Sequence, residues 1–231
     1  MIIEHPVFMI LATLSIFRIG EVLFDKSGKI PIFNPVIISI AFLVCFLIIF
    51  NVTYTEYKQA TNALYLMLAP AIISLAVPLY KNIERVKELL PAIALTVIIA
   101  GSGIVLSAVA LALWAHLPEP MVLALMTKSI SAPIALEVAN LLDGDPSLTI
   151  IAVFSTGLPG VIIVPTLLRT LNINDDATKG LILGITAHAF GIARATSISP
   201  SATAFATIGM GLMGCFVAFI TPLFIGLIKH L

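Results

Sequence analysis

The chain has 231 residues, of which 60% are hydrophobic and 10% are charged, and its mean hydropathy is +1.14. A soluble domain carries about 25% charged residues, so this composition excludes a soluble fold and makes lipid the solvent for much of the surface. Twelve Lys and Arg residues balance twelve Asp and Glu residues. No basic or acidic excess therefore indicates a nucleic-acid partner.

The two cysteines and the N-terminus exclude further classes of protein. Cys45 and Cys215 both lie inside apolar runs, which argues against a disulfide framework or a metal site and predicts small buried thiols. The first residues lack a positively charged region and a small-residue cleavage site. The sequence therefore predicts no removable signal peptide, and the first apolar run is expected to be the first membrane helix.

A membrane-spanning helix needs about 20 mostly apolar residues. Eight segments approach this length, and they are residues 6–24, 35–50, 62–80, 90–114, 120–142, 147–171, 177–195 and 202–228. The linkers are short and hold most of the charge, which leaves no room for a separate soluble domain. We therefore predict an all-α polytopic integral membrane protein, with about seven or eight membrane-embedded segments in one transmembrane domain, residues 1–231.

The positions of Lys and Arg predict the orientation, because short cytoplasmic loops are enriched in them. The first and third loops should be cytoplasmic, and the N-terminus outside, since these loops hold Lys26, Lys29, Lys81, Arg85 and Lys87. Arg169 and Lys179 also fall on the cytoplasmic side only if segment 120–142 returns to the membrane face that it left. Lys229 would then place the C-terminus in the cytoplasm. The pattern favours a broken or re-entrant helix there.

The composition of segment 120–142 agrees with a break. It contains Lys128, Glu137, a central Pro133 and several hydroxyl groups. Pro133 cannot donate a hydrogen bond to the preceding turn and disfavours helix at the residue before it. Irregular backbone at membrane depth is tolerated only where it is buried in protein or lines a cavity. The sequence therefore predicts two half-helices that meet at a polar junction.

An ionisable side chain at membrane depth costs about 2.5–3.5 kcal/mol on insertion scales, and it indicates function by default. Lys128 would offer positive charge to a carboxylate substrate, helped by the hydroxyls of Ser129 and Ser131 and by the N–H groups that open the second half-helix. Glu137 would carry a proton or pair with Lys128. The alternative is structural, with a buried Lys–Glu pair or a lysine that extends to the lipid headgroups.

Segment 177–195 carries a second candidate site. Its spacing places five residues on one face of a helix, namely Gly180, Gly184, His188, Gly191 and Ala195. Small residues there allow close approach of a helix or a ligand, and a histidine among them titrates near neutral pH, which favours proton coupling. The alternative is a packing helix whose histidine bonds a neighbour. Arg194 lies about 120° around the helix, and it either binds the ligand or marks the membrane interface.

Weaker patterns remain. Asn62 opens segment 62–80 as a substrate-binding candidate or as a simple helix cap. Residues 69–72 and 132–135 are similar, and each is followed by an apolar helix and a pair of glycines, which indicates an internal repeat of residues 62–114 and 120–171, parallel or inverted. No metal-ligand spacing, nucleophile elbow or catalytic triad is present. We expect no cofactor, no metal and no enzyme activity.

Three motifs resemble the LrgB/CidB family. Residues 128–137 resemble its K-S-[VI]-[ST]-[TA]-P-I-A-[ML]-E signature, residues 188–195 its H-x-x-G-[TI]-x-[RK]-A stretch, and residues 69–80 its G-P-A…A-x-P-L-Y stretch. The resemblance covers residues 62–231 in the family's order, after N-terminal helices in residues 1–61. Ala69 replaces the usual Gly. Ile192 stands where Thr is common, which removes one candidate hydroxyl.

The resemblance implies two functions. Some family members are holin-like or antiholin-like modulators of murein hydrolase export and autolysis, whereas plastid relatives transport glycolate and glycerate and bacterial relatives are linked to pyruvate. The matching motif residues are Lys128, Ser129, Ser131, Pro133, Glu137, His188, Gly191 and Arg194. The resemblance also implies a bacterial inner membrane and a small LrgA/CidA-like membrane partner. Glycine-rich helix faces are compatible with a homodimer and equally with packing inside one chain.

Carboxylate transport is the interpretation that we favour from the sequence. It explains why Lys, Glu, His and a central Pro lie inside apolar segments, with or without proton coupling. A holin-like pore or pore regulator is the alternative, but a simple pore does not need a broken helix with a specific Lys and Glu. An intramembrane enzyme lacks a nucleophile–base arrangement.

Overall fold

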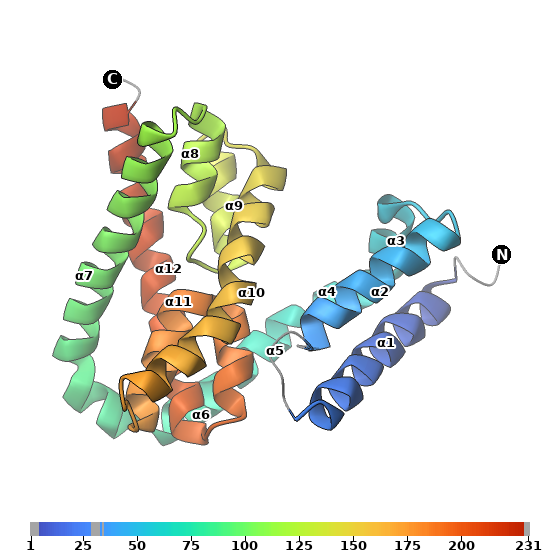
Figure 1. Cartoon of the computed structure of the whole chain (residues 1–231), viewed down its shortest axis with the longest axis horizontal. Helices are drawn as coiled ribbons and strands as arrows, with labels where there is room; N and C mark the ends of the chain where they lie inside the picture. Colours follow the sequence, from blue (N-terminus) through green and yellow to red (C-terminus); the bar gives the residue numbers. More distant parts are fainter. Residues whose placement is uncertain (1–4, 29–32, 34, 229–231) are drawn as a thin grey trace. The chain divides into compact units, whose positions relative to one another are not determined.

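The computed structural model describes residues 5–28, 33 and 35–228, and every regular element among them is a helix. Lys29 and Lys229, which contributed to the predicted orientation, lie outside these residues. The chain divides into two compact units, Met1–Ser74 and Leu75–Leu231 (Figure 1). Each unit is described by itself.

The first unit contains five helices, α1 (Pro6–Lys26), α2 (Pro35–Ile49), α3 (Tyr54–Ala60), α4 (Asn62–Leu66) and α5 (Leu68–Ser74). A capping box fixes the start of α3, because Thr53 accepts from the Glu56 backbone and the Glu56 carboxylate accepts from the Thr53 backbone. Thr13 of α1 bonds the Tyr57 hydroxyl at 2.9 Å. This bond and the packing of α1 against α2 hold the unit together.

The prediction of one membrane segment at residues 62–80 is wrong. The structure has three short helices there, α4, α5 and α6 (Ala76–Lys81), and the division between the units falls at Leu75. The physical reason is the two prolines, since Pro70 and Pro78 have no N–H to donate to the carbonyl four residues earlier. Those carbonyls belong to Leu66 and Ser74, where α4 and α5 end.

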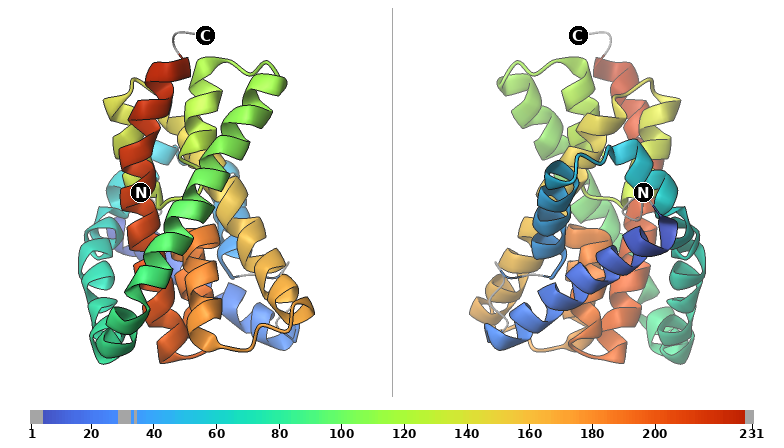
Figure 2. Two further views of the ribbon diagram at one scale, coloured as in Figure 1. Left: turned by 90° about the vertical axis from the view of Figure 1, so that its left-hand side faces the viewer. Right: turned by 90° about the vertical axis from the view of Figure 1, so that its right-hand side faces the viewer.

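The second unit contains α6 and six further helices. They are α7 (Ile83–Trp114), α8 (Glu119–Met126), α9 (Ala132–Leu141), α10 (Pro146–Thr170), α11 (Asp176–Thr196) and α12 (Pro200–Ile228). In two perpendicular views α7, α10 and α12 run the length of the unit, α8 and α9 lie at one end, and α11 lies at the other (Figures 1 and 2). One apolar core joins residues of α7, α8, α10, α11 and α12, including Val105, Met126, Val153, Ile185 and Met213.

Among the residues that the structure describes, four helices are long and apolar enough to cross a membrane, namely α1, α7, α10 and α12. A fifth span is possible if α2 and α3, which are bent by 115° to each other, form one crossing. The predicted seven or eight segments are therefore not confirmed as spans. The shortfall comes from the three short helices at residues 62–81 and from two segments of the second unit that turn back inside it.

Both cysteines are exposed, so the prediction of buried thiols is wrong. Cys45 lies on α2 and Cys215 on α12, as expected. In a membrane protein an apolar stretch is compatible with lipid on any face, so an apolar neighbourhood in sequence does not imply burial inside the protein.

Candidate functional site

The predicted break in segment 120–142 is confirmed. Helix α8 ends at Met126, four residues without helical structure follow Thr127, and α9 begins at Ala132. Ser131 is the extended N-cap of α9, with φ −65° and ψ 145°, and Pro133 lies in its first turn. Helices α8 and α9 occupy the same end of the unit (Figure 2). They form a hairpin whose tip, the first tip, is made of residues 127–131.

The first tip is polar and largely buried. Thr127 and Ser129 are 0% and 2% exposed, and Lys128 is half-buried. The Lys128 ammonium donates to Ser129 Oγ at 3.4 Å. Of the described carboxylates, none pairs with Lys128, and Glu137 lies exposed on α9. The structure therefore does not contain the Lys–Glu pair that the sequence left open.

Segment 177–195 is not the continuous helix that the sequence predicts. The backbone of His188 has φ 42° and ψ −123°, which interrupts α11. A Cβ on Gly191 would collide with the carbonyl oxygen of Leu183, although eight residues of straight helix would separate the two by about 12 Å. The chain therefore turns back at His188, and α11 is a second hairpin. The predicted single face is divided between its two arms.

His188 forms the second tip. Its positive φ is rare for a residue with a side chain and stores strain of the kind that clusters at functional sites. The side chain is 1% exposed, and the Val153 backbone of α10 lies within hydrogen-bonding reach of the ring. The other ring nitrogen, Nε2, is buried and has no partner. A Cβ on Gly157 of α10 would lie 2.5 Å from His188 Cε1, so the glycine makes room for the ring.

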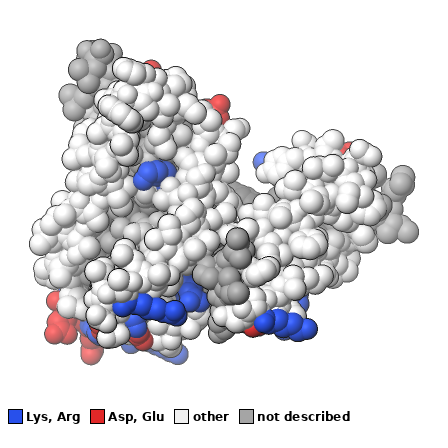
Figure 3. All heavy atoms as spheres, viewed as in Figure 1, with Lys and Arg blue, Asp and Glu red and all other residues white. Residues whose placement is uncertain are grey.

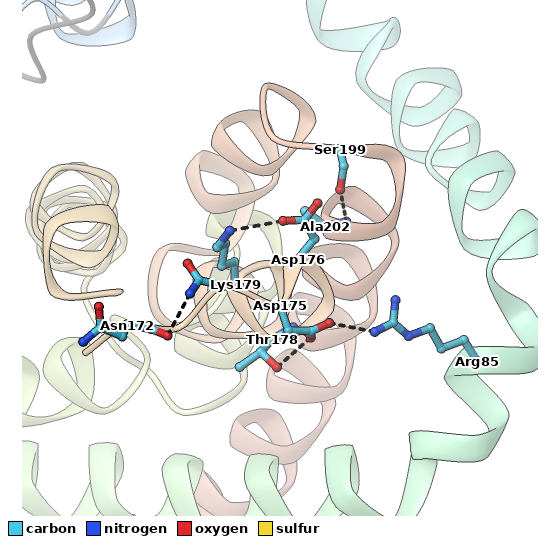
Figure 4. Close-up of polar contacts among 9 residues, drawn as sticks. Arg85, Asn172, Asp175, Asp176, Thr178, Lys179, Ser199 and Ala202 are labelled. Atoms are coloured by element: carbon cyan, nitrogen blue, oxygen red, sulfur yellow. Dashed lines mark hydrogen bonds and ion pairs between the residues drawn. The ribbon is translucent and has the colours of Figure 1, made fainter. Parts of the chain in front are cut away.

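The two hairpins enter the unit from opposite ends. The second hairpin begins where α7 begins, because Arg85 near the start of α7 donates to Asp175, the N-cap of α11, at 2.7 Å. The first hairpin begins after α7 ends at Trp114. Figure 4 shows the polar contacts at the start of α11, where Asp175 also accepts from Thr178 and Lys179 donates to Asp176.

Contacts with α12 place both tips at one level. Gly184 of α11 abuts Ala206, and a Cβ on Gly214 would lie 2.7 Å from Ile134 Cδ1 of α9. Ala206 and Gly214 are about 12 Å apart along α12. His188 lies about 6 Å beyond Gly184 along α11. The first tip precedes Ile134 by a few residues, and the loop between α8 and α9 points toward the end of the unit that holds α11 (Figure 2). Both tips therefore reach the level of α12 that lies between Ala206 and Gly214.

This arrangement places the ends of four half-helices at one level of the unit. α9 and the second arm of α11 both start at a tip, and their first N–H groups carry partial positive charge. Ser131 makes no side-chain cap to α9. Half-helix starts that meet near the middle of a membrane domain are typical of the sites where transporters bind the anionic groups of a substrate.

The other predicted site residues have different surroundings. Pro133 is exposed in the first turn of α9, and Gly191 is buried between the two arms of α11. Arg194 lies away from both tips, beside Arg169 at the end of α10. Asn62 belongs to the first unit, where it lines a surface pocket with Lys58. The described residues contain no group of three or more His, Cys, Asp or Glu placed to hold a metal ion.

The turn in α11 changes the predicted orientation. Because α11 returns to the end where it began, α12 starts near Asp176, whose carboxylate interacts with the Ser199 side chain just before α12. Helix α12 then ends at the opposite face of the unit (Figure 1). The end of α12 and the cations of α7 therefore lie on opposite sides. Figure 3 shows that most of the visible Lys and Arg side chains of this unit gather at the end where α7 begins. The prediction that puts both in the cytoplasm requires α11 to cross the membrane fully, and the turn at His188 does not support that crossing.

Comparison with known proteins identifies the family. A model of the LrgB-like family matches residues 13–227. This chain belongs to the LrgB-like family. The match confirms the resemblance and extends it into the N-terminal helices, beyond the residues 62–231 that the motifs cover.

Relatives of this LrgB-like chain include two proteins that are called holin-like protein CidB. The one from Staphylococcus epidermidis is 30% identical over 225 residues, and the one from Staphylococcus aureus is 31% identical over 224 residues, with 96% of both chains covered in each case. Protein YwbG of Bacillus subtilis is 30% identical over 177 residues, 77% of this chain and 79% of its own. No solved structure matches this chain at a significant level. The family and the apolar helices identify a multi-pass membrane protein.

Proposed function

We propose that this LrgB-like protein moves a small anion across the membrane, at a site between the tips of its two opposed hairpins. The single observation that carries the proposal is the position of the tips. Hairpins from opposite ends reach the same level of α12, and each tip presents the start of a half-helix. A site reached from two faces by two separate hairpins is suited to alternating access.

The residues at the tips favour an anion over a cation or a neutral solute. Lys128 supplies a half-buried positive charge that no described carboxylate neutralises. Ser129 supplies a buried hydroxyl, and the half-helix starts supply N–H donors. Within this class we propose small carboxylates such as glycolate, glycerate and pyruvate, on the basis of the family resemblance. The proposal includes no catalytic step and no cofactor.

Proton coupling is part of the same proposal. Histidine is the side chain whose ordinary pKa lies nearest to physiological pH, and the unpartnered Nε2 of His188 is a place where a proton can be gained or lost. The residue lies at a tip, so that a change in its charge would act directly on the hairpin. A transport rate that is independent of an imposed pH gradient would remove this part of the proposal.

A holin-like function is the second candidate. The names of the relatives from both Staphylococcus species favour it over carboxylate transport, since none of the names of the relatives described above mentions a carboxylate. In this function the chain would form or regulate a pore that affects murein hydrolase export and autolysis. We propose for either function a homodimer, a small LrgA/CidA-like membrane partner and the plasma membrane of a bacterium, with the N-terminus outside.

The two functions differ in the size of the solute that crosses. Purified full-length protein is reconstituted into liposomes loaded with radiolabelled glycolate and a fluorescent dye too large for a carrier. Release of glycolate with complete retention of the dye supports the anion-transport proposal. Release of both solutes at rates that do not saturate supports the holin-like function and overturns the first proposal.

A further inference from the structure

A second basic site lies at the end of the second unit where α10 ends. A pocket of about 310 Å³ opens between α10 and both arms of the α11 hairpin. Three cations line it, Arg169 from α10, Lys179 from the first arm and Arg194 from the second arm. Leu168 and Leu183 line its apolar part. Lys179 and Arg194 would be about 22 Å apart in a straight helix, so the pocket exists only because α11 turns back.

Two of the three cations are not neutralised. Lys179 donates to Asp176 at 3.2 Å. In contrast, no carboxylate among the described residues forms an ion pair with Arg169 or Arg194. The two guanidinium groups are close enough to repel each other, and the Arg194 contact that is present is a 3.4 Å hydrogen bond to the Ser197 hydroxyl. Two like charges held beside one small pocket leave it with unbalanced positive charge.

The side chains match the chemistry of an oxyanion. A guanidinium presents a planar pair of N–H donors that fits a carboxylate or phosphate group with two parallel bonds. Asn174, which also lines the pocket, adds an amide that can donate. The volume is at the lower end of the range of small-molecule sites. The apolar part suits a ligand with a short hydrocarbon portion.

We propose that this pocket binds the carboxylate or phosphate group of an anionic ligand through Arg169 and Arg194. The site is separate from the hairpin tips and does not rest on the transport proposal. A bound anion would bridge α10 and the second arm of α11, so occupancy would hold the two together. The group can come from a soluble anion or from the headgroup of an acidic lipid, since both present the same oxygens.

The test measures binding, not transport, so that it can fail independently of the proposed function. Full-length protein is placed in nanodiscs of phosphatidylcholine, and its thermal unfolding midpoint is followed while inorganic phosphate is added. The variants are Arg169→Gln and Arg194→Gln. The matched control is Lys87→Gln, which removes one exposed positive charge of α7 outside the pocket. A parallel set of nanodiscs contains phosphatidylglycerol and no phosphate.

The expected result is a saturable rise of the midpoint with phosphate in the unaltered protein and in Lys87→Gln. The half-saturating concentration should increase about tenfold or more in each arginine variant, as expected for losing a hydrogen bond to a charged group. If a lipid headgroup is the occupant, phosphatidylglycerol alone should raise the midpoint in the same two proteins and not in the arginine variants. Either pattern supports the site and identifies the source of the anion.

A general salt effect would give a different pattern. Phosphate stabilises many proteins because it is excluded from their surface, and that effect does not saturate and does not depend on one arginine. Equal midpoint shifts in all four proteins, or no shift with either phosphate or phosphatidylglycerol, would overturn the proposal. If an arginine variant does not fold, Arg169→Lys keeps the charge and removes the paired donors. Unchanged phosphate binding in that variant would also count against the site.

Discussion

The contact between α11 and α12 gives a stability prediction that can be worked from the structure. A Cβ placed on Gly184 would lie 2.8 Å from both Cα and the carbonyl carbon of Ala206, whereas ordinary contacts are 3.4–4 Å. Gly184→Ala must therefore separate the two helices by about 0.6 Å or more, since the carbonyl oxygen of Ala206 lies closer still to the added Cβ. Overpacking of this kind costs about 1–3 kcal/mol. Alanine's higher helix propensity offsets about 0.8–1.0 kcal/mol of that.

Gly103 on α7 is the matched control, because nothing lies within 4 Å of a Cβ placed there. Gly103→Ala should therefore stabilise the protein by about 0.8–1.0 kcal/mol. The two alanine variants should differ by about 1–3 kcal/mol, which corresponds to about 2–12 °C in the unfolding midpoint for a chain of this size. The assay is thermal unfolding of each variant in the same detergent. Equal midpoints for the two variants would refute the close packing of the second hairpin on α12.

Three further predictions concern the start of α11, the second tip and the topology. Hydrogen bonds from the backbone and hydroxyl of Thr178, together with Arg85, lower the pKa of the Asp175 carboxyl group. These interactions therefore stabilise the fold above the unfolded pKa of about 3.9, and this stabilisation is lost as the pH falls through the lower folded pKa. Asp175→Ala should cost about 1 kcal/mol at pH 7, and chemical denaturation should show that its deficit shrinks at acidic pH; a deficit independent of pH would contradict this. Gly157→Ala should displace the ring of His188 and abolish glycolate transport while the unfolding midpoint changes by only a few degrees, and retained transport would place His188 outside the mechanism. Single cysteines are introduced in a background with both native cysteines replaced by serine, and each is labelled with a charged maleimide from either side of the membrane. Ala115→Cys and Ser147→Cys should react from one side, and Asn174→Cys and Ser197→Cys from the other. Labelling of the first two from opposite sides would mean that α8 and α9 cross the membrane.

The first hairpin could be predicted from the sequence because its break has a local cause. Pro133 removes a backbone donor and restricts the residue before it, and the polar residues around it would be costly in lipid. These properties belong to adjacent residues, so they are visible without a structure. The position of both halves at the same end of the unit has a separate indication in the sequence, since the Lys and Arg pattern favoured a segment that returns to the face it left.

The second hairpin could not be predicted from the sequence. Residues 184–195 contain no proline, and their small residues recur at helical spacing, so the pattern favours one continuous helix. The turn at His188 depends on contacts between residues that are distant along the chain. Gly157 leaves space for the ring, and Gly191 allows the second arm to approach Leu183. From the sequence, Gly191 was expected only to allow close approach of a helix or a ligand.

The basic pocket illustrates the same limit. Arg194 was a candidate from its motif, whereas Arg169 and Lys179 contributed only to the predicted orientation. Their side chains line one pocket because α11 reverses direction. Charge patterning along a sequence assigns such residues to a membrane face, but it does not show which of them share a site.

The most direct test of the central claim is the rate of labelled glycolate uptake into proteoliposomes as a function of glycolate concentration, for the unaltered protein, Lys128→Ala and Lys87→Ala. If the hairpin tips form the anion site, uptake saturates in the unaltered protein and in Lys87→Ala, is competed by glycerate, and is lost in correctly folded Lys128→Ala. If uptake does not saturate, or if Lys128→Ala transports as well as Lys87→Ala does, the tips are not the anion site and the holin-like function becomes the better account.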